Sequence, residues 1–142
     1  MDVKIIRVDK TLPLPEYHTT GAVAFDLYSR VDAELEPNEI KLLPSNFIIE
    51  VPEGHALIIA ARSSTYKKGL RLTNSIGVID QDYHGPNDEI HLAIYNYTDE
   101  KVLIPKGERI AQGLIIPVTK ANWQEVDVIK ETSRGGFGST GA

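Results

Sequence analysis

The chain is 142 residues long, enough for one domain with a buried core and too short for two ordinary domains. Its net charge of −5 argues against a general nucleic-acid-binding protein, because such proteins neutralise many phosphates with lysine and arginine. Cysteine is absent from the sequence, which excludes disulfides, a thiolate nucleophile and a cysteine-based zinc site.

The amino-terminal residues 1–7 alternate charged and apolar side chains and lack the long apolar core of a signal peptide. The longest apolar run, residues 56–61, is far too short to span a bilayer. We therefore expect a cytoplasmic protein that has no membrane partner.

Short strands separated by turn residues are predicted along most of the chain. Their apolar patterns favour strands at residues 3–8, 22–29, 39–43, 47–51, 55–60, 78–79, 90–97, 102–104 and 109–116. Proline and glycine between these segments are typical of turns. Many short strands joined in this way predict an all-β fold, either a barrel or a double-sheet jelly roll.

One acid, Asp26, lies within the apolar segment 22–29. A buried carboxylate without a partner is strongly destabilising, because it loses its hydration without compensation. Asp26 is therefore expected either to pair with an arginine or to lie at the edge of a site near a cation.

The segment Arg62–Leu70 breaks the strand pattern and predicts one short helix. Ser63 and Ser64 can cap free backbone N–H groups, and Gly69 fits the end of a helix. An arginine, two hydroxyls and exposed N–H groups also have the chemistry of an anion site. Both interpretations, caps alone or an anion site, stay open at this point.

The central stretch, residues 77–85, gathers two carboxylates and a tyrosine. We predict a hairpin here, whose second strand is residues 90–97. Asp80, Asp82 and Tyr83 would then converge at the hairpin tip, where they could contact a ligand. Aspartate and glycine are also common turn residues, so the hairpin alone does not establish a site.

Arg109 and Gln112 lie on opposite sides of a regular strand unless a bulge or the preceding turn realigns them. Their spacing alone does not make a site.

The glycine-rich segment 131–142 has no apolar pattern and predicts a flexible tail after a β domain of residues 1–130. Glycine-rich backbone with arginine, serine and threonine can also wrap a phosphate. Phe137 is unusual in a linker and would make sense if it stacks on a flat group.

Five segments in this order resemble the five sequence motifs of the homotrimeric all-β deoxyuridine triphosphatase (dUTPase) family. They are residues 22–29, 62–64, 74–85, 107–112 and 134–141. The resemblance implies a jelly-roll-like trimer with three active sites, each assembled from all three subunits. It also implies hydrolysis of dUTP to dUMP and pyrophosphate with Mg²⁺.

By this resemblance, Asp80 is the general base that deprotonates water for attack on the α-phosphorus. Tyr83 packs against the deoxyribose and leaves no room for a ribose hydroxyl. Asn74 recognises uracil together with nearby backbone, which includes Gly77 and Val78.

The resemblance also implies where the phosphates and the metal are bound. Asp26 matches the acid associated with the water shell of Mg²⁺, an ion that keeps several waters and binds substrate phosphates. Arg109 matches a position that pairs with an acid for structure, and Phe137 would stack over the uracil. The other implied phosphate and lid residues are Arg62, Ser63, Ser64, Gln112, Arg134, Gly138, Ser139 and Thr140.

The chain departs from the usual motifs in places. Its connection at residues 86–89 is longer than is common, and Ala24, Phe25, Ala61 and Ser64 replace the more usual Gly, Tyr, Pro and Gly. These departures bear on the local backbone more than on the reaction.

Two alternatives differ from a dUTPase. The related dCTP deaminases share the implied fold, but the position of their glutamate is Ala93 here. A trimer that binds nucleotide and regulates a protein partner is the second alternative, although an intact Asp80 and an intact tail motif argue against a purely binding role, because neither is needed to hold a trimer together. The four histidines show no spacing that indicates a zinc site.

Overall fold

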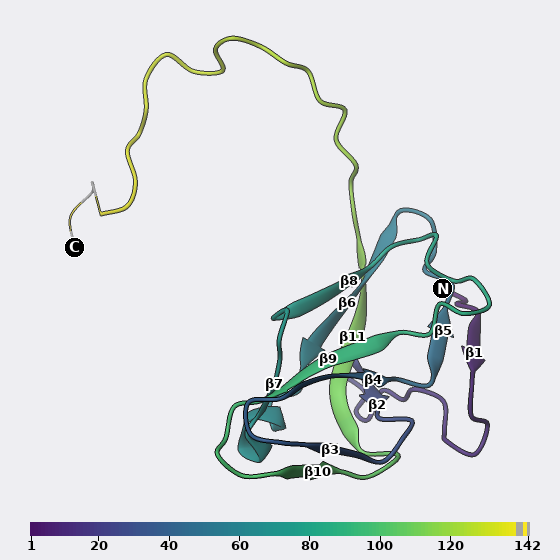
Figure 1. Cartoon of the computed structure of the whole chain (residues 1–142). Coiled ribbons are helices and arrows are strands. Elements are labelled where there is room, and N and C mark those ends of the chain that lie inside the picture. Colours follow the sequence, from purple (N-terminus) through teal and green to yellow (C-terminus); the bar gives the residue numbers. More distant parts are fainter. Residues whose placement is uncertain (139–140, 142) are drawn as a thin grey trace.

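A computed structural model of the chain describes residues 1–138 and 141. The fold is all-β and jelly-roll-like, as predicted, with a single turn of 3-10 helix, η1 (Thr65–Lys68), in the described part (Figure 1). The strands are β1 (Ile5–Arg7), β2 (Phe25–Tyr28), β3 (Ala33–Leu35), β4 (Ile40–Pro44), β5 (Phe47–Ile49), β6 (His55–Ala61), β7 (Leu70–Leu72), β8 (Ile76–Ile79), β9 (His91–Asn96), β10 (Val102–Ile104) and β11 (Arg109–Pro117).

Two larger sheets carry most of the strands. One has the order β2-β11-β6-β8 and the other the order β4-β9-β7, while β1 pairs with β5 and β3 with β10. Every pairing is antiparallel. The long strand β11 therefore lies between β2 and β6, and it places residues from three distant parts of the sequence side by side.

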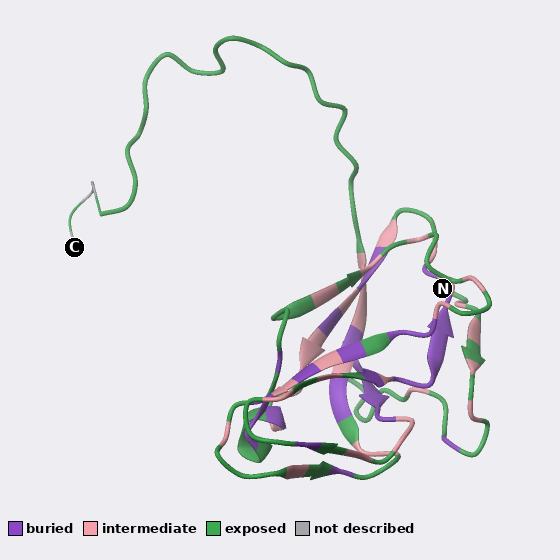
Figure 2. Ribbon diagram, viewed as in Figure 1, coloured by how far each residue is buried: buried purple, intermediate pink, exposed green. Residues whose placement is uncertain are grey.

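The core lies between these sheets, where apolar side chains from both form one buried cluster (Figure 2). Leu27 and Leu57 come from the first sheet, and Leu92 and Ile94 come from the second. On β9 the buried residues alternate with more exposed ones, the pattern of a strand that packs one face on a core. The side chains that face this core are not available to a ligand, so a site must be formed by residues at the strand ends and in the connections.

The prediction of a hairpin at residues 77–85 was wrong. β8 pairs with β6, whereas β9 pairs with β4 and β7, so the central stretch crosses from one sheet to the other. A Cβ on Gly77 would lie 3.2 Å from the Cβ of Ile59 on β6, tighter than an ordinary contact. Glycine at this position therefore suits the close approach of β8 to β6.

The predicted helix at 62–70 is only the single turn η1. Gly69 ends it in the left-handed region with φ of 71°, as predicted, but Ser64 makes no side-chain capping bond. Thr65 instead accepts a hydrogen bond from the Arg62 N–H and donates one to the Ile110 carbonyl, which ties the turn to β11. Strands β6 and β7 on either side leave no room for a longer helix.

Beyond β11 the chain leaves the barrel. Every described residue from 117 onward is exposed, and the tail runs away from the sheets (Figures 1 and 2). The proposed division at residue 130 stays a prediction, and Ser139 and Thr140 lie outside the described residues. Within the described part of the chain, no helix is long and apolar enough to cross a membrane.

Candidate functional site

A small pocket of about 140 Å³ is lined by residues of β8 and β9 and by neighbouring residues of β6 and β7. It exists because β8 and β9 pair with other strands and not with each other. Its lining includes Asn74, Gly77 and Val78, the three positions predicted to recognise a base. Ala93 also lines it, so the position that would carry the deaminase glutamate has no carboxylate.

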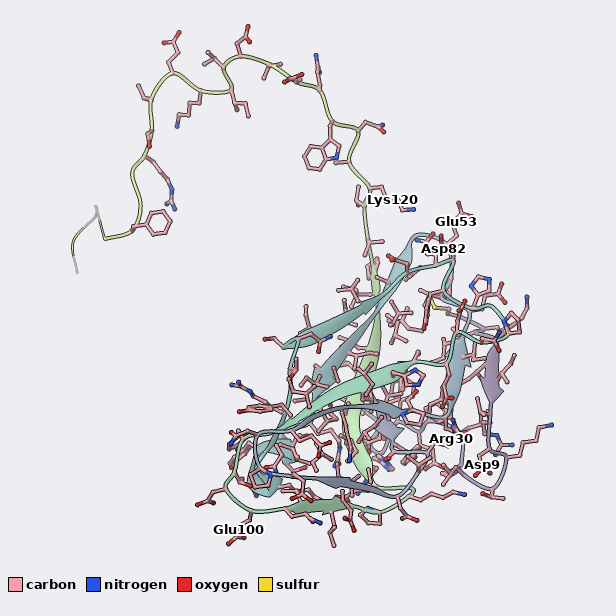
Figure 3. All side chains as sticks on the ribbon, viewed as in Figure 1. Asp9, Arg30, Glu53, Asp82, Glu100 and Lys120 are labelled. Atoms are coloured by element: carbon pink, nitrogen blue, oxygen red, sulfur yellow. The ribbon has the colours of Figure 1, made fainter. Side chains whose placement is uncertain are left out.

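A larger polar cleft of about 480 Å³ adjoins this small pocket at Val78, which lines both. The polar cleft is lined by His55, Ala56, Val78, Asp80, Gln81, Asp82, Val118 and Lys120. Figure 3 shows Asp82 and Lys120 at the same end of the barrel, where the tail departs. A small pocket with both polar and apolar lining, beside a charged cleft, can hold a ligand with a flat ring and a charged extension.

Asp80 is placed in the polar cleft by the end of β8. Ile79, the last residue of that strand, lies opposite Leu57 on β6, and the backbone turns directly after it. The Asp80 carbonyl accepts a hydrogen bond from the Tyr83 N–H at 3.3 Å. The Asp80 carboxylate is exposed and has no hydrogen-bond or ion-pair partner among the described residues. It is therefore free to bind a water molecule.

The connection that follows Asp80 is anchored by a partly buried ion pair. Glu89 accepts two hydrogen bonds from the Arg30 guanidinium, at 2.8 and 3.0 Å, and a third from the backbone N–H of Asn46 at 2.8 Å. The hydrogen bonding to Glu89 raises the pKa of Arg30. Tyr83 lies on this connection, and its hydroxyl is 3.5 Å from the Glu89 carbonyl oxygen. Sequence reasoning missed this pair because its partners are far apart in the chain.

Asp26 is buried and lies at the centre of a second cluster of charged side chains, separate from the polar cleft. Its Oδ1 accepts a hydrogen bond from Arg62 Nε at 2.7 Å, and its Oδ2 lies 3.1 Å from Arg109 and 2.9 Å from His18 Nε2. The predicted pairing with an arginine is confirmed. Tyr28 on the same strand is buried, and this desolvation raises the pKa of its phenol.

A bulge in β11 brings Arg109 and Gln112 to this cluster. The register with β2 shifts between Arg109 and Ala111, and afterwards Gln112 lies directly opposite Asp26. Ile110 and Ala111 are both buried, which a regular strand on a one-sided core does not allow. The bulge that the sequence left open, which changes the relative orientation of Arg109 and Gln112, is therefore present.

Arg62 extends the second cluster toward the predicted anion segment. Its Nη1 lies 3.4 Å from Ser64 Oγ and 3.4 Å from the Arg109 carbonyl oxygen, while Ser63 is exposed. Two arginines around one aspartate leave the cluster positively charged. The guanidinium groups of this cluster can therefore bind an anion.

The polar cleft that contains Asp80 and the cluster around Asp26 lie at opposite ends of β6. Asp80 follows the β8 residue opposite Leu57, near the start of β6, whereas Arg62 follows its last residue. A strand advances about 3.3 Å per residue, so the two groups are separated by roughly 20 Å along β6. The tail runs away from the sheets (Figure 1). Its residues Arg134, Phe137 and Gly138 are exposed and so do not pack on the polar cleft or on the Asp26 cluster. The predicted site residues are thus not brought together within one chain.

Dedicated metal ligands are absent from the described residues. In this part of the chain, no group of three or more histidines or carboxylates could hold a metal ion.

Comparisons with known proteins agree on one family. The sequence model of the dUTPase family matches residues 10–141. Deoxyuridine 5'-triphosphate nucleotidohydrolase of Dictyoglomus turgidum is 41% identical over 146 residues, which cover 98% of this chain and 97% of that protein. The enzyme of the same name from Nautilia profundicola is 39% identical over 144 residues and covers 99% of each.

Solved structures give the same result. A crystal structure of dUTPase from Streptococcus mutans is 34% identical, covers 87% of this chain and 100% of that one, and has a TM-score of 0.78. The dUTPase of Staphylococcus bacteriophage 80alpha with dUpNHpp covers 99% of each chain with a TM-score of 0.86. At 24% identity the latter supports the fold alone.

Proposed function

The chain belongs to the dUTPase family and is a dUTP diphosphatase, and we propose that Asp80 is the general base of its reaction. The observation that carries this proposal is the pair of adjoining sites that share Val78. The small pocket takes the uracil, and the polar cleft, which contains the unpartnered Asp80, takes the phosphates.

Asp80 holds a water molecule and accepts its proton as the water oxygen attacks the α-phosphorus of dUTP. The bond between the α-phosphorus and the bridging oxygen breaks, and pyrophosphate leaves with that oxygen. The remaining product is dUMP. A carboxylate without other partners suits this role, because a general base must be within hydrogen-bond reach of the proton it removes.

Asn74 and the strand backbone at Gly77 and Val78 select the base. They line the small pocket, where amide and peptide groups can pair with the polar edge of uracil and the confined space excludes the methyl group of thymine. Tyr83 follows the same strand and packs against the deoxyribose. Selection of base and sugar thus comes from one continuous segment.

Mg²⁺ fits this chain only through its water shell. Three partners already occupy the Asp26 carboxylate, which offers about four acceptor positions, so one position is left for a metal-bound water. Substrate phosphates would supply the direct ligands, which agrees with the lack of a three-residue ligand group in the described chain. When bound, the ion neutralises phosphate charge.

We propose a homotrimer with shared active sites, and the separation between Asp80 and the cluster around Asp26 supports sharing between subunits. Arg62, Ser63, Ser64 and Gln112 cannot reach a phosphate beside Asp80 of the same chain, because β6 lies between them. We propose that they serve the Asp80 of a neighbouring subunit. The tail, with Arg134, Phe137, Gly138, Ser139 and Thr140, closes over the nucleotide as a lid. The cytoplasmic location stays a prediction from the sequence.

The variant Asp80→Asn tests the assignment of the base. The amide cannot accept the proton, so turnover of dUTP is expected to fall by roughly 10²–10⁴-fold. Binding of the unhydrolysable analogue dUpNHpp is expected to stay close to that of the unchanged protein, because the shape of the cleft is retained. Both quantities are measured on the full chain, by pyrophosphate release and by calorimetry.

Asp82→Asn is the matched control, since it removes the other carboxylate of the polar cleft. We expect a loss of less than roughly tenfold, because Asp82 acts as a turn residue and not as the base. Equal losses in the two variants, or unchanged turnover in Asp80→Asn, would contradict the assignment.

A further inference from the structure

Two strands end beside each other at the edge of the sheet that carries Asp80. β8 and β11 each pair with β6 in the antiparallel sense, so they run in the same direction and end at the same edge. Pro117, the last residue of β11, lies opposite His55, and Ile79, the last residue of β8, lies opposite Leu57. The residues that follow β8 and β11 therefore flank the start of β6.

Lys120 follows β11 at this edge. The chain before it is held by a hydrogen bond of 2.8 Å from the Val118 N–H to the Gly54 carbonyl. Neighbouring strands are about 4.8 Å apart, so the backbones of β8 and β11 are separated by roughly 10 Å across β6. Lys120 and Asp80 line the same polar cleft from these two sides. A phosphate group between them can contact both side chains.

The charges in the polar cleft favour a cationic side chain there, in addition to any metal ion on the phosphates. Asp80 and Asp82 both line it, and two carboxylates repel a triphosphate. Lys120 is the lining residue with a permanent positive charge, whereas Arg62 lies near the far end of β6. Lys120 is exposed and has no hydrogen-bond or ion-pair partner in the part of the chain that the structure describes. Its ammonium group is therefore available to a ligand.

We propose that Lys120 is a further substrate-binding residue, which donates hydrogen bonds to an oxygen of the α-phosphate while Asp80 holds the attacking water. The assignment rests on the proposed function of the polar cleft. A lysine suits this place because its ammonium is a compact charge with three donors on a flexible stem. The same contact offsets the repulsion between the phosphate and the two carboxylates.

Replacement of Lys120 by methionine tests this contact, because methionine keeps the unbranched apolar stem and removes the charge. We expect kcat/KM for dUTP to fall roughly 10- to 150-fold, the range for one lost hydrogen bond to a charged group. Most of the change is expected in KM, since the contact is already made in the bound substrate. Lys120→Arg, which keeps a cation, is expected to restore most of the loss.

Lys10→Met is the control, because it makes the same change in net charge at an exposed site outside the polar cleft. Its kcat/KM is expected to equal that of the unchanged protein. Binding of dUpNHpp should weaken in Lys120→Met in proportion to KM, and inhibition by deoxyuridine, which has no phosphate, should stay the same. Thermal unfolding of the variants is followed in parallel.

Three outcomes would contradict the proposed role of Lys120 or the proposed function. If Lys120→Met behaves like Lys10→Met, or if Lys120→Arg fails to restore activity, Lys120 does not bind the phosphate. Equal weakening of dUpNHpp and deoxyuridine would also overturn the assignment, because it would indicate a general distortion of the site. A wild-type protein that does not hydrolyse dUTP would instead overturn the proposed function itself.

Discussion

Asp26 and Asp80 show how one side chain takes different roles in different surroundings. Asp26 is buried, and two arginines and a histidine occupy its oxygens. Asp80 is exposed and has no side-chain partner in the described chain. The first carboxylate orients cationic side chains, and the second is free to hold water.

Part of this contrast could be predicted from single residues. The cost of burying an unpaired carboxylate required a partner for Asp26, and an arginine was one of the two expected, the other being a cation at the edge of a site. His18 could not be predicted in the same way, because it lies in a connection without regular pattern. Its contact with Asp26 depends on how that connection folds back over β2.

Tyr83→Ala tests the selection of the sugar. Loss of the ring opens space beside the deoxyribose, so hydrolysis of UTP is expected to rise relative to dUTP by roughly tenfold or more. Tyr83→Phe is the control and should keep the discrimination, because the hydroxyl makes only a long contact of 3.5 Å with Glu89. Steady-state kinetics with both nucleotides measure the ratio. Unchanged discrimination in Tyr83→Ala would mean that the sugar is recognised elsewhere.

At the scale of elements, local patterns predicted the strands better than their partners. All nine predicted strand segments are present, whereas β3 and β7 were missed because each has only three residues, too few for its alternation of buried and exposed side chains to stand out. The partner of β8 could not be read from its own residues, since turn signals around 80–85 fit a hairpin and a crossover equally well. β8 pairs with β6, which produces the crossover and not the hairpin. The same pairing leaves the small pocket between β8 and β9.

We expect the crossover between β8 and β9 to depend on the partly buried pair of Arg30 and the buried Glu89. Arg30→Met leaves the Glu89 carboxylate buried without its cation, which is expected to destabilise the protein by about 2–4 kcal/mol. The double change Arg30→Met with Glu89→Met should recover part of this loss, because no buried charge remains. Urea unfolding at equal protein concentrations measures the differences.

Lys4→Met is the matched control for this pair. Its partner is Glu50; the Lys4 side chain is largely exposed and that of Glu50 is 42% exposed, so we expect little change in stability. If Arg30→Met is as stable as Lys4→Met, the pair does not anchor the crossover.

At the scale of the whole molecule, the order of the motifs was visible in the sequence and their arrangement in space was not. Arg62 and Asp80 belong to motifs that are neighbours in the chain, yet the strand β6 separates them by roughly 20 Å. The tail leaves the barrel and, as far as it is described, does not return to it (Figure 1). These separations arise from strand direction, which the residue pattern alone does not specify.

The most direct measurement compares nucleotides on the unchanged, full-length protein with Mg²⁺. Pyrophosphate release is followed with dUTP, dTTP, dCTP, dATP, dGTP and UTP at equal concentrations. We predict rapid release from dUTP and little from the others, because we propose that the small pocket excludes the thymine methyl group and that Tyr83 excludes the ribose hydroxyl. Comparable release from dTTP or UTP, or release of ammonia from dCTP, would contradict the account.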